Sequence, residues 1–371
     1  MDLDLRIEAL DARALSVPLI EPFVIATGRV DATRAAEIEA RVAGDGRSRR
    51  GLGEAACLPP VTREDQDDVL REIARVARKL VGQPLGRTGD AIAAALRDAV
   101  PDSPVARVAI ETALLDAVAR LSNVSLRTFL GGEVGSRTDR LETDVTVAIA
   151  DPARMGELAR QWAERGFRSL KVKVGKDVDA DARALEAIAA AAPGARLRVD
   201  ANAGYAARDA LALARACDRL RIPVECWEQP CGAQDFDGMR QVADALEAPV
   251  VADESVQGPD DLRTLLRLRY ADGVNLKLAK VGSLLGAYRM GLEARTGGLA
   301  LMAGGMVETR LGMAAAAHLA CALGGVEFVD LDTALLLVDD PFEGGYSAAG
   351  PYYTVSATPG LGVRRRGEPE S

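Results

Sequence analysis

The chain has 371 residues, of which 48% are hydrophobic, and a formal net charge of −9 at pH 7. This length is too great for one small domain and suits a barrel of roughly 250 residues with a second domain. An acidic chain without a basic stripe is not a binder of nucleic acid. Because no run reaches roughly 18 apolar residues and the start lacks a signal-peptide pattern, we expect a cytoplasmic protein that binds no membrane.

The first 130 residues predict strands followed by helices. Residues 7–19 and 35–57 have strand patterns, with a loop at Ala26 to Val30 between them and a GDG turn inside the second. Residues 64–82 and 103–121 have helical periodicity, and Ser103 is placed as an N-cap before Pro104. We therefore predict an α+β domain over residues 1–135.

From about residue 140 strand-like runs alternate with helical segments. The first run, TDVTVAI, precedes an Asp-Pro helix start at Asp151 and Pro152. Seven further runs are SLKVKV, RLRVDAN, VECWEQ, VVADES, GVNLKLA, LALMAG and VEFVDLD. Since no Gly-rich phosphate-binding sequence follows the first strand, a closed (β/α)7β barrel of the TIM type is favoured over an open sheet. We assign the barrel to residues 136–335, and we expect residues 336–371 to return to the α+β domain.

Three acidic residues each end one of these runs. Asp200, Glu228 and Asp253 are 28 and 25 residues apart on the third, fourth and fifth predicted strands. The carboxyl ends of parallel barrel strands meet at one face, so the three carboxylates can converge on one ion. An all-oxygen site with room for water and substrate suits Mg²⁺. For any one acid alone, a helix cap or a strand-end salt bridge is the simpler interpretation.

Lysines lie on the strands on either side of these acids. Lys171 and Lys173 share a face of the second strand, and Lys277 lies on the sixth with Lys280 three residues later. The second and sixth strands of an eight-stranded ring are opposite each other. Lys173 and Lys277 can therefore face a substrate from two sides, one removing an α-proton and the other delivering one. We expect neighbouring cations and a metal to lower the pKa of the basic lysine. Surface lysines are the alternative, and Lys280 remains open as the base.

A second acidic pair ends the eighth strand. Asp330 and Asp332 are two residues apart and should point to the same side. They would attract an ammonium group at the far end of a substrate. The alternative is that one of them caps the next helix and the other meets a lysine.

The histidine and the cysteines are not favoured as catalytic residues. The single histidine, His318, lies in MAAAAHLACAL, where a packed helical histidine is favoured and a Ser-His-Asp triad is not. Any general base must be another residue type. The cysteines are odd in number and form no CxxC pair, so we expect reduced thiols, mostly in the core. They are Cys57, Cys217, Cys226, Cys231 and Cys321.

The segments KVKVG, VDAN, WEQP, ADES and NLKLAK follow the order KxK, DxN, ExP, DES and NxKxxK. By these motifs and their spacing the chain resembles the enolase superfamily, in its muconate-lactonising-enzyme subgroup, over essentially its whole length. VDLDT resembles the Asp-x-Asp pair of the dipeptide epimerases of the L-Ala-D/L-Glu type. The resemblance implies that the α+β domain and the tail cap the barrel mouth.

The resemblance also implies roles for individual residues. Lys173 and Lys277 would be the two bases, and Lys171 would contact the substrate carboxylate. The metal ligands would be Asp200, Glu228 and Asp253, binding one Mg²⁺ per subunit with Mn²⁺ as a substitute, and the metal would stabilise the enediolate that α-proton loss creates. Further residues expected to line or support the site are Thr146, Asn202, Ser255, Met306 and Glu308, the last as a hydrogen-bond partner of Lys277.

Specificity is expected to depend on the capping loops. Where L-Ala-D/L-Glu epimerases have an arginine, this chain has Gly28 with Arg29 beside it, which makes a glutamate substrate doubtful. Loops Phe23 to Arg34 and Gly53 to Pro60 would close over the substrate, and Arg29 or Glu54 would select by charge.

The function expected from these features is Mg²⁺-dependent epimerisation of a dipeptide at the α-carbon of its C-terminal residue by 1,1-proton transfer. Alternatives are an N-acyl amino acid racemase, an o-succinylbenzoate synthase or a cycloisomerase and, more remotely, a non-catalytic barrel that binds a ligand. The expected partner is a small molecule, with no nucleic acid or membrane, and the chain is expected to form a homo-oligomer.

Overall fold

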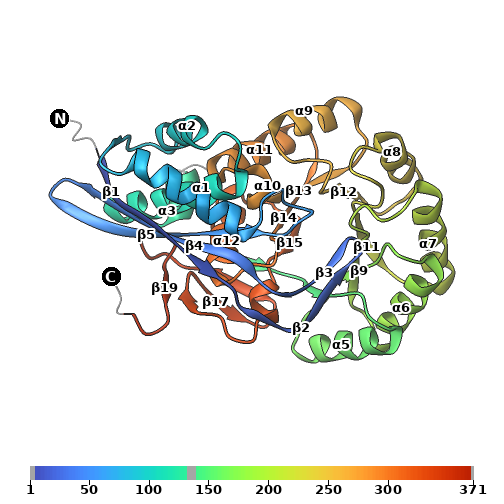
Figure 1. The fold of residues 1–371 in the computed structure, drawn as a ribbon. Helices are drawn as coiled ribbons and strands as arrows, with labels where there is room; N and C mark the ends of the chain where they lie inside the picture. The colour runs from blue at the N-terminus through green and yellow to red at the C-terminus, as the bar shows by residue number, and fades with distance from the viewer. Residues whose placement is uncertain (1–4, 132–138, 369–371) are drawn as a thin grey trace.

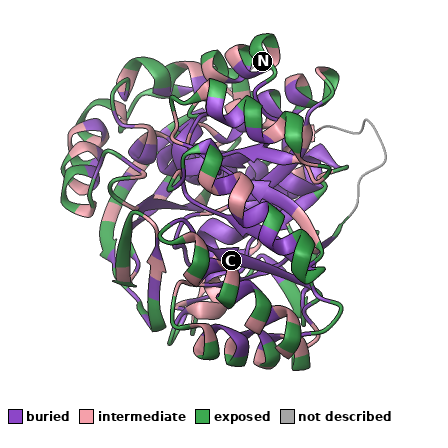
Figure 2. Ribbon diagram, turned by 90° about the vertical axis from the view of Figure 1, so that its right-hand side faces the viewer, coloured by how far each residue is buried: buried purple, intermediate pink, exposed green. Residues whose placement is uncertain are grey.

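The computed structural model describes residues 5–131 and 139–368. A sheet and helices from the N-terminal region lie beside a ring of parallel strands surrounded by helices (Figure 1). The ring is buried, and exposed residues gather on the outer sides of the helices (Figure 2). None of the helices in the described ranges is long and apolar enough to cross a membrane.

The N-terminal region forms an antiparallel sheet covered by helices. The sheet has the order β5-β4-β1-β6 and contains β1 (Leu5–Leu15), β4 (Arg34–Gly44), β5 (Arg47–Cys57) and β6 (Pro84–Leu85). The helices are α1 (Gln66–Leu80), α2 (Gly89–Ala99), α3 (Pro104–Leu121) and α4 (Leu126–Gly131). A Cβ atom at Gly51 or Gly53 would lie 2.0 or 2.1 Å from a carbonyl oxygen of α3, so glycine is required for this close packing.

Strand and helix boundaries correct two details of the sequence prediction. The expected loop at Ala26 to Val30 is a tighter hairpin, in which β2 (Pro18–Ile25) pairs with β3 (Gly28–Ala32). Ser103 stands at the N-cap of α3, but its hydroxyl donates to Glu64 instead of capping the helix. Glu64 also accepts from the backbone of Val105 and so provides the cap. Asp151 caps its helix as predicted.

Eight parallel strands form the barrel in sequential order, as predicted. They are β8 (Val145–Val147), β9 (Ser169–Lys173), β10 (Arg196–Asp200), β11 (Val224–Glu228), β12 (Val250–Ala252), β13 (Gly273–Lys277), β14 (Ala300–Gly304) and β15 (Phe328–Asp330). The connecting helices are α5 (Pro152–Glu164), α6 (Val178–Ala191), α7 (Ala207–Leu220), α8 (Phe236–Ala245), α9 (Pro259–Leu268), α10 (Leu278–Val281), α11 (Leu284–Thr296) and α12 (Arg310–Leu323). A backbone hydrogen bond of 3.0 Å from Asp144 to Val329 joins the first strand region to the last.

The segment after the barrel contacts the N-terminal unit. It contains the short helix η1 (Thr333–Leu336) and the strands β16 (Phe342–Gly344), β17 (Tyr346–Ala349), β18 (Tyr352–Val355) and β19 (Val363–Arg365), and β18 pairs with β7 (Arg140–Glu142). Arg365 of β19 forms an ion pair with Glu37 of β4. The predicted domain boundary at residue 135 lies outside the described residues, and the boundary at residue 335 stays a prediction.

The hairpin of β2 and β3 extends from the N-terminal unit to the barrel (Figure 1). The backbone of Ile149, which follows barrel strand β8, donates to Val24 at 3.0 Å. Leu19 forms an isolated bridge with Leu337 after the last barrel strand. Two points of the hairpin are therefore held against the carboxyl ends of the barrel strands.

The histidine and the cysteines are buried, as the sequence predicts. All five cysteines are free thiols. His318 is fully buried on α12, where Nδ1 accepts from the backbone of Arg127 at 3.1 Å and Nε2 lies 3.1 Å from the carbonyl of Leu361. Because both contacts join separate segments, the histidine links α12 to α4 and to the C-terminal segment.

Burial lowers the pKa of His318 to about 4, from 6.5 for an exposed imidazole. The unfolded chain therefore binds a proton at this residue that the folded chain does not, so stability should fall as pH falls from about 6.5 towards 4. We expect this residue to contribute a loss of about 2 kcal/mol between pH 7 and pH 5. Urea unfolding of the wild type and of His318→Gln at pH 7 and pH 5 measures this loss of stability. An equal pH dependence in the two proteins would contradict the assignment.

Candidate active site

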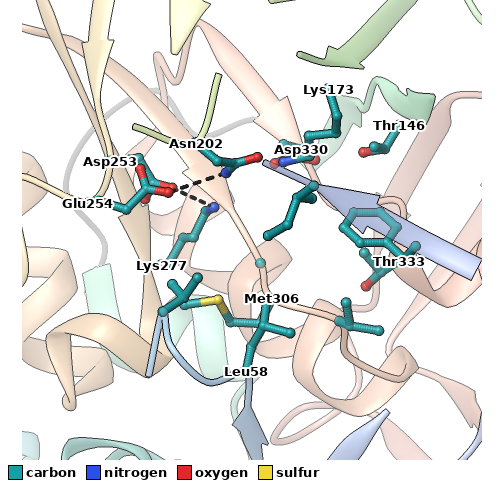
Figure 3. Close-up of a pocket in the computed structure, with 15 residues that line it drawn as sticks. Leu58, Thr146, Lys173, Asn202, Asp253, Glu254, Lys277, Met306, Asp330 and Thr333 are labelled. Carbon is teal, nitrogen blue, oxygen red and sulfur yellow. Dashed lines mark hydrogen bonds and ion pairs between the residues drawn. The ribbon is translucent and has the colours of Figure 1, made fainter. Parts of the chain in front are cut away.

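A pocket opens where the N-terminal unit meets the carboxyl ends of the barrel strands (Figure 3). It is lined by Phe23, Ile25, Leu58, Val61, Thr146, Lys173, Asn202, Asp253, Glu254, Lys277, Gly305, Met306, Val307, Asp330 and Thr333. Of the residues predicted for the site, six lie on this lining: Lys173, Lys277, Asp253, Asp330, Thr146 and Met306, and Asn202 joins them as the predicted supporting residue. The other predicted residues are not part of this lining.

The strand register places the charged side chains in a row around the barrel. Lys173 is paired with Asp200, and Asp200 is paired with Glu228, on successive parallel strands. Lys173 Nζ lies 2.6 Å from Asp200 Oδ2. Burial opposes the charge of Asp200, but the lysines outweigh it and hold the pKa of this carboxyl below its usual value. The predicted acids and lysines thus meet at one end of the ring.

Lys171 lies at the centre of the acids rather than on the pocket surface. Its Nζ is 2.6 Å from Asp330, 2.7 Å from Glu228 and 3.1 Å from Asp200. Burial opposes its charge, but the carboxylates, first that of Asp330, raise the pKa of Lys171 well above the usual value. Lys171 therefore forms ion pairs with acids from three strands.

Lys277, on the sixth strand, and Lys280, just after it, have different environments. Lys277 lines the pocket and lies 2.8 Å from Asp253 Oδ2. Lys280 is buried and donates to Asp253, to its carboxylate and to its backbone oxygen. Lys280 does not line the pocket, and its contacts show that it positions Asp253.

The charges nearest to the sixth-strand lysine are carboxylates. Burial opposes the charge of Lys277, but the surrounding carboxylates, of which Asp253 acts most strongly, together raise the pKa of this amine. The prediction of a lowered pKa included the charge of a divalent metal as well as neighbouring cations, and it stays a prediction. In the structure the nearest charges are carboxylates, which stabilise the ammonium form.

Amide side chains missed by sequence reasoning position the acids. Gln229 accepts hydrogen bonds from the backbones of Asp253 and Ser255 and donates to the Ser255 hydroxyl at 2.7 Å. Asn275 donates to Glu228 at 2.9 Å. Ser255 therefore supports Gln229 and does not line the pocket. WEQP and NLKLAK contain these amides, but their contacts depend on packing between strands.

Two residues next to the acids have unusual backbones. Asn202 and Gln229 have positive φ values of 43° and 36°, which residues other than glycine rarely adopt. Asn202 donates its backbone N–H to Asp200 at 2.9 Å and its amide to Glu254 at 3.3 Å. Strained backbone of this kind is frequent at functional sites, where the surrounding structure maintains it.

The oxygen atoms of the acids fit a hard cation. In the described part of the chain, Glu228 Oε2 has no hydrogen-bond partner and forms an ion pair with Lys171, and the buried side-chain oxygens of Asn202 and Asn275 also lack hydrogen-bond partners. Among the described residues, however, the carboxylates whose ligand atoms lie within 4.8 Å of one another are those of Asp144, Asp330 and Asp332, which could also hold a metal ion. Lysine ammonium groups lie between the predicted metal ligands. The assignment of the metal to Asp200, Glu228 and Asp253 stays a prediction.

The two acids of the eighth strand have different environments. Asp330 lines the pocket, and although burial acts in the opposite direction, the nearby lysines, first Lys171, together hold the pKa of its carboxyl below the usual value. Asp332 accepts from the backbone of Thr146 at 2.5 Å and is fully buried. Burial, with the charge of Asp330, raises the pKa of Asp332 to about 7. Asp332 is therefore not on the pocket lining with Asp330, and the prediction that both face a substrate is corrected.

Three charged residues predicted near the pocket make other contacts in the structure. Arg29 forms an ion pair of 2.9 Å with Asp31, and its side chain is 60% exposed. Glu54 is buried and accepts from Thr309 and Gly312, so it caps α12, and it is not among the residues that line the pocket. Glu308 accepts from the backbone of Met306 at 2.8 Å, and none of the hydrogen bonds found for described residues joins it to Lys277.

A parallel barrel whose acids and lysines meet at the carboxyl ends of its strands, under an α+β unit, is the architecture of a barrel enzyme that carries out acid–base chemistry. Residues 154–368 match the enolase C-terminal domain-like family, and residues 9–131 match the N-terminal domain of mandelate racemase and muconate lactonizing enzyme. The chain belongs to the enolase superfamily.

Relatives with known names are similar over almost the whole chain. An aromatic dipeptide epimerase from Herpetosiphon aurantiacus is 38% identical over 96% of this chain and 98% of its own. The substrate-liganded L-Ala-D/L-Glu epimerase of Bacillus subtilis has 33% identity and a TM-score of 0.89, with 96% of this chain and 98% of that chain covered. The dipeptide epimerase of Enterococcus faecalis V583, complexed with Mg and L-Leu-L-Tyr, has 28% identity and a TM-score of 0.88, with 96% and 99% covered.

Proposed function

We propose that this protein epimerises dipeptides at the α-carbon of the C-terminal residue, with Lys173 and Lys277 as the two bases. The observation that carries the proposal is the position of these lysines. They lie four strands apart in an eight-stranded ring and line one pocket, which they enter from different sides (Figure 3). A carbon held between them can lose its proton to one amine and receive a proton from the other on the opposite face.

The proton transfer requires that one lysine be neutral and the other charged. In the direction from one isomer to the other, the neutral amine accepts the α-proton and the opposite ammonium donates its own. The reverse direction exchanges these roles. Lys171, which is buried and paired with three acids, keeps its proton and provides a fixed positive charge near the substrate carboxylate.

We assign the cation site to Asp200, Glu228 and Asp253, with Mg²⁺ as the ion. Their oxygens suit it, and the E. faecalis relative was solved with Mg and a dipeptide. When bound, the ion supplies positive charge that stabilises the negative charge developing on the substrate carboxylate. One ion per subunit, replacement by Mn²⁺ and assembly as a homo-oligomer stay predictions.

We assign the substrate ammonium to Asp330. This carboxylate lies on the eighth strand, opposite the fourth strand that bears Glu228, and it lines the same pocket as both lysines. A dipeptide anchored by its carboxylate at the metal ligands would direct its amino terminus across the ring towards Asp330. An N-acyl amino acid, which lacks the charged amine, would leave this carboxylate without a substrate partner.

N-acetylation of a good dipeptide substrate should therefore reduce kcat/KM by about 30- to 5,000-fold, because a charge-assisted contact of about 2 to 5 kcal/mol is lost. In Asp330→Asn the difference between the free and acetylated dipeptide should shrink. The measurement is kcat/KM for both compounds with both proteins. If the wild type prefers the acetylated compound, the protein is instead an N-acyl amino acid racemase.

A further inference from the structure

Six apolar side chains on the pocket lining come from three separate segments of the chain. They are Phe23 and Ile25 of β2, Leu58 and Val61 after β5, and Met306 and Val307 after β14. In Figure 3 Leu58 and Met306 lie together at one end, away from Asp253, Asn202 and Lys173. The six side chains together are called here the apolar wall, and the centroid of its Phe23 ring lies 5.8 Å from Lys173 Nζ.

No charged side chain of the capping loops reaches this wall, within the part of the chain that the structure describes. Arg29 is paired with Asp31 in solvent, and Glu54 is bonded to the start of α12. The charged residues that line the pocket are Lys173, Lys277, Asp253, Glu254 and Asp330. The two lysines are the proposed bases. Asp253 and Asp330 are acids at strand ends, and Glu254 is the direct neighbour of Asp253.

In the binding mode proposed above, the four substituents of the reacting carbon point in four different directions. The proton points to Lys173 or to Lys277, the carboxylate points to the strand-end acids, and the nitrogen leads towards Asp330. The side chain takes the remaining direction, which leads out of the ring to the capping unit. This step rests on the function proposed above.

We propose that the enzyme acts on dipeptides whose C-terminal residue is apolar, and that the apolar wall rejects acidic and cationic residues at that position. An apolar side chain there leaves water and packs against Leu58 and Met306. A carboxylate or an ammonium group would lose its hydration without gaining a partner of opposite charge. Discrimination by an unpaired charge is stronger than discrimination by one methylene group.

The test compares four dipeptides with alanine at the N-terminus and leucine, phenylalanine, glutamate or lysine at the C-terminus, all in the L form. The measured quantity is kcat/KM for exchange of the α-proton of the C-terminal residue in D₂O. We expect it to be at least about 100-fold higher for the leucine and phenylalanine compounds than for the glutamate and lysine compounds. Leu58→Arg should raise the value for the glutamate compound relative to the leucine compound by about 10-fold or more. Leu58 is half-buried, so an arginine can be accommodated there.

Ile20→Arg is the matched control. Ile20 lies on β2 but is 63% exposed and does not line the pocket, so this variant should keep the wild-type preference. Equal rates for all four compounds, or a preference for glutamate or lysine, would overturn the specificity while leaving the epimerase proposal intact. If none of the four compounds exchanges its α-proton, both proposals are wrong.

Discussion

Replacing Lys173 or Lys277 by alanine is expected to reduce epimerisation by at least about 10³-fold, because each removes one of two acid–base groups that act on opposite faces of the same carbon. Each variant retains the other lysine. It should therefore still exchange the α-proton of one stereoisomer with D₂O, and the two variants should select opposite isomers. Proton NMR of the L,L and L,D forms of a good dipeptide measures both exchange and epimerisation.

Lys176→Ala is a suitable control for these variants. Lys176 is exposed three residues after Lys173 and does not line the pocket, so its replacement should leave the rate unchanged. If both lysine variants exchange the same isomer, the amines do not act on opposite faces. If Lys277→Ala keeps full activity, Lys280 or another group would have to be the second base.

Removal of divalent metal with EDTA should lower turnover by about 10³-fold or more, because electrostatic stabilisation of the developing carboxylate charge is worth several kcal/mol. Mg²⁺ should restore the activity, and Mn²⁺ is expected to replace it. Asp200→Asn, Glu228→Gln and Asp253→Asn should lose activity in the same way. Each substitution also weakens binding of the ion, so the rise of Tm that Mg²⁺ causes in the wild type should be reduced in all three.

The Tm measurement separates the two carboxylate clusters. If the ion binds at Asp144, Asp330 and Asp332 instead, Asp144→Asn will abolish the Mg²⁺-dependent rise and Glu228→Gln will not. Asp237→Asn, at an exposed residue in the first turn of α8, controls for a general loss of negative charge. Full activity in a protein stripped of metal would exclude metal dependence altogether.

Much of the fold was predictable because the signals are local. Alternation of strand and helix from residue 140 onwards, with apolar runs ended by polar groups, predicts a parallel barrel and its carboxyl-end face. The period of two along a strand places Lys171 and Lys173 on one side, and the structure brings both into contact with Asp200. The predicted metal acids lie at the ends of neighbouring strands for the same reason.

The same rule failed at Asp330 and Asp332. Asp330 lines the pocket, whereas Asp332 accepts a hydrogen bond from the backbone of Thr146. Asp332 is beyond the last residue of β15, where the chain turns into η1. A period of two holds only while the chain remains extended, and the sequence did not mark where the strand ends.

The motifs of the sequence by themselves determined the family, the barrel and the set of charged residues at its mouth, since each is encoded within a few neighbouring positions. Only the tertiary structure decided what these residues contact. Lys280 holds Asp253, Glu54 caps α12, and Arg29 remains in solvent. The apolar wall joins β2, the loop after β5 and the loop after β14, which are distant in the sequence. Such long-range contacts depend on how the whole chain packs, and no local pattern specifies them.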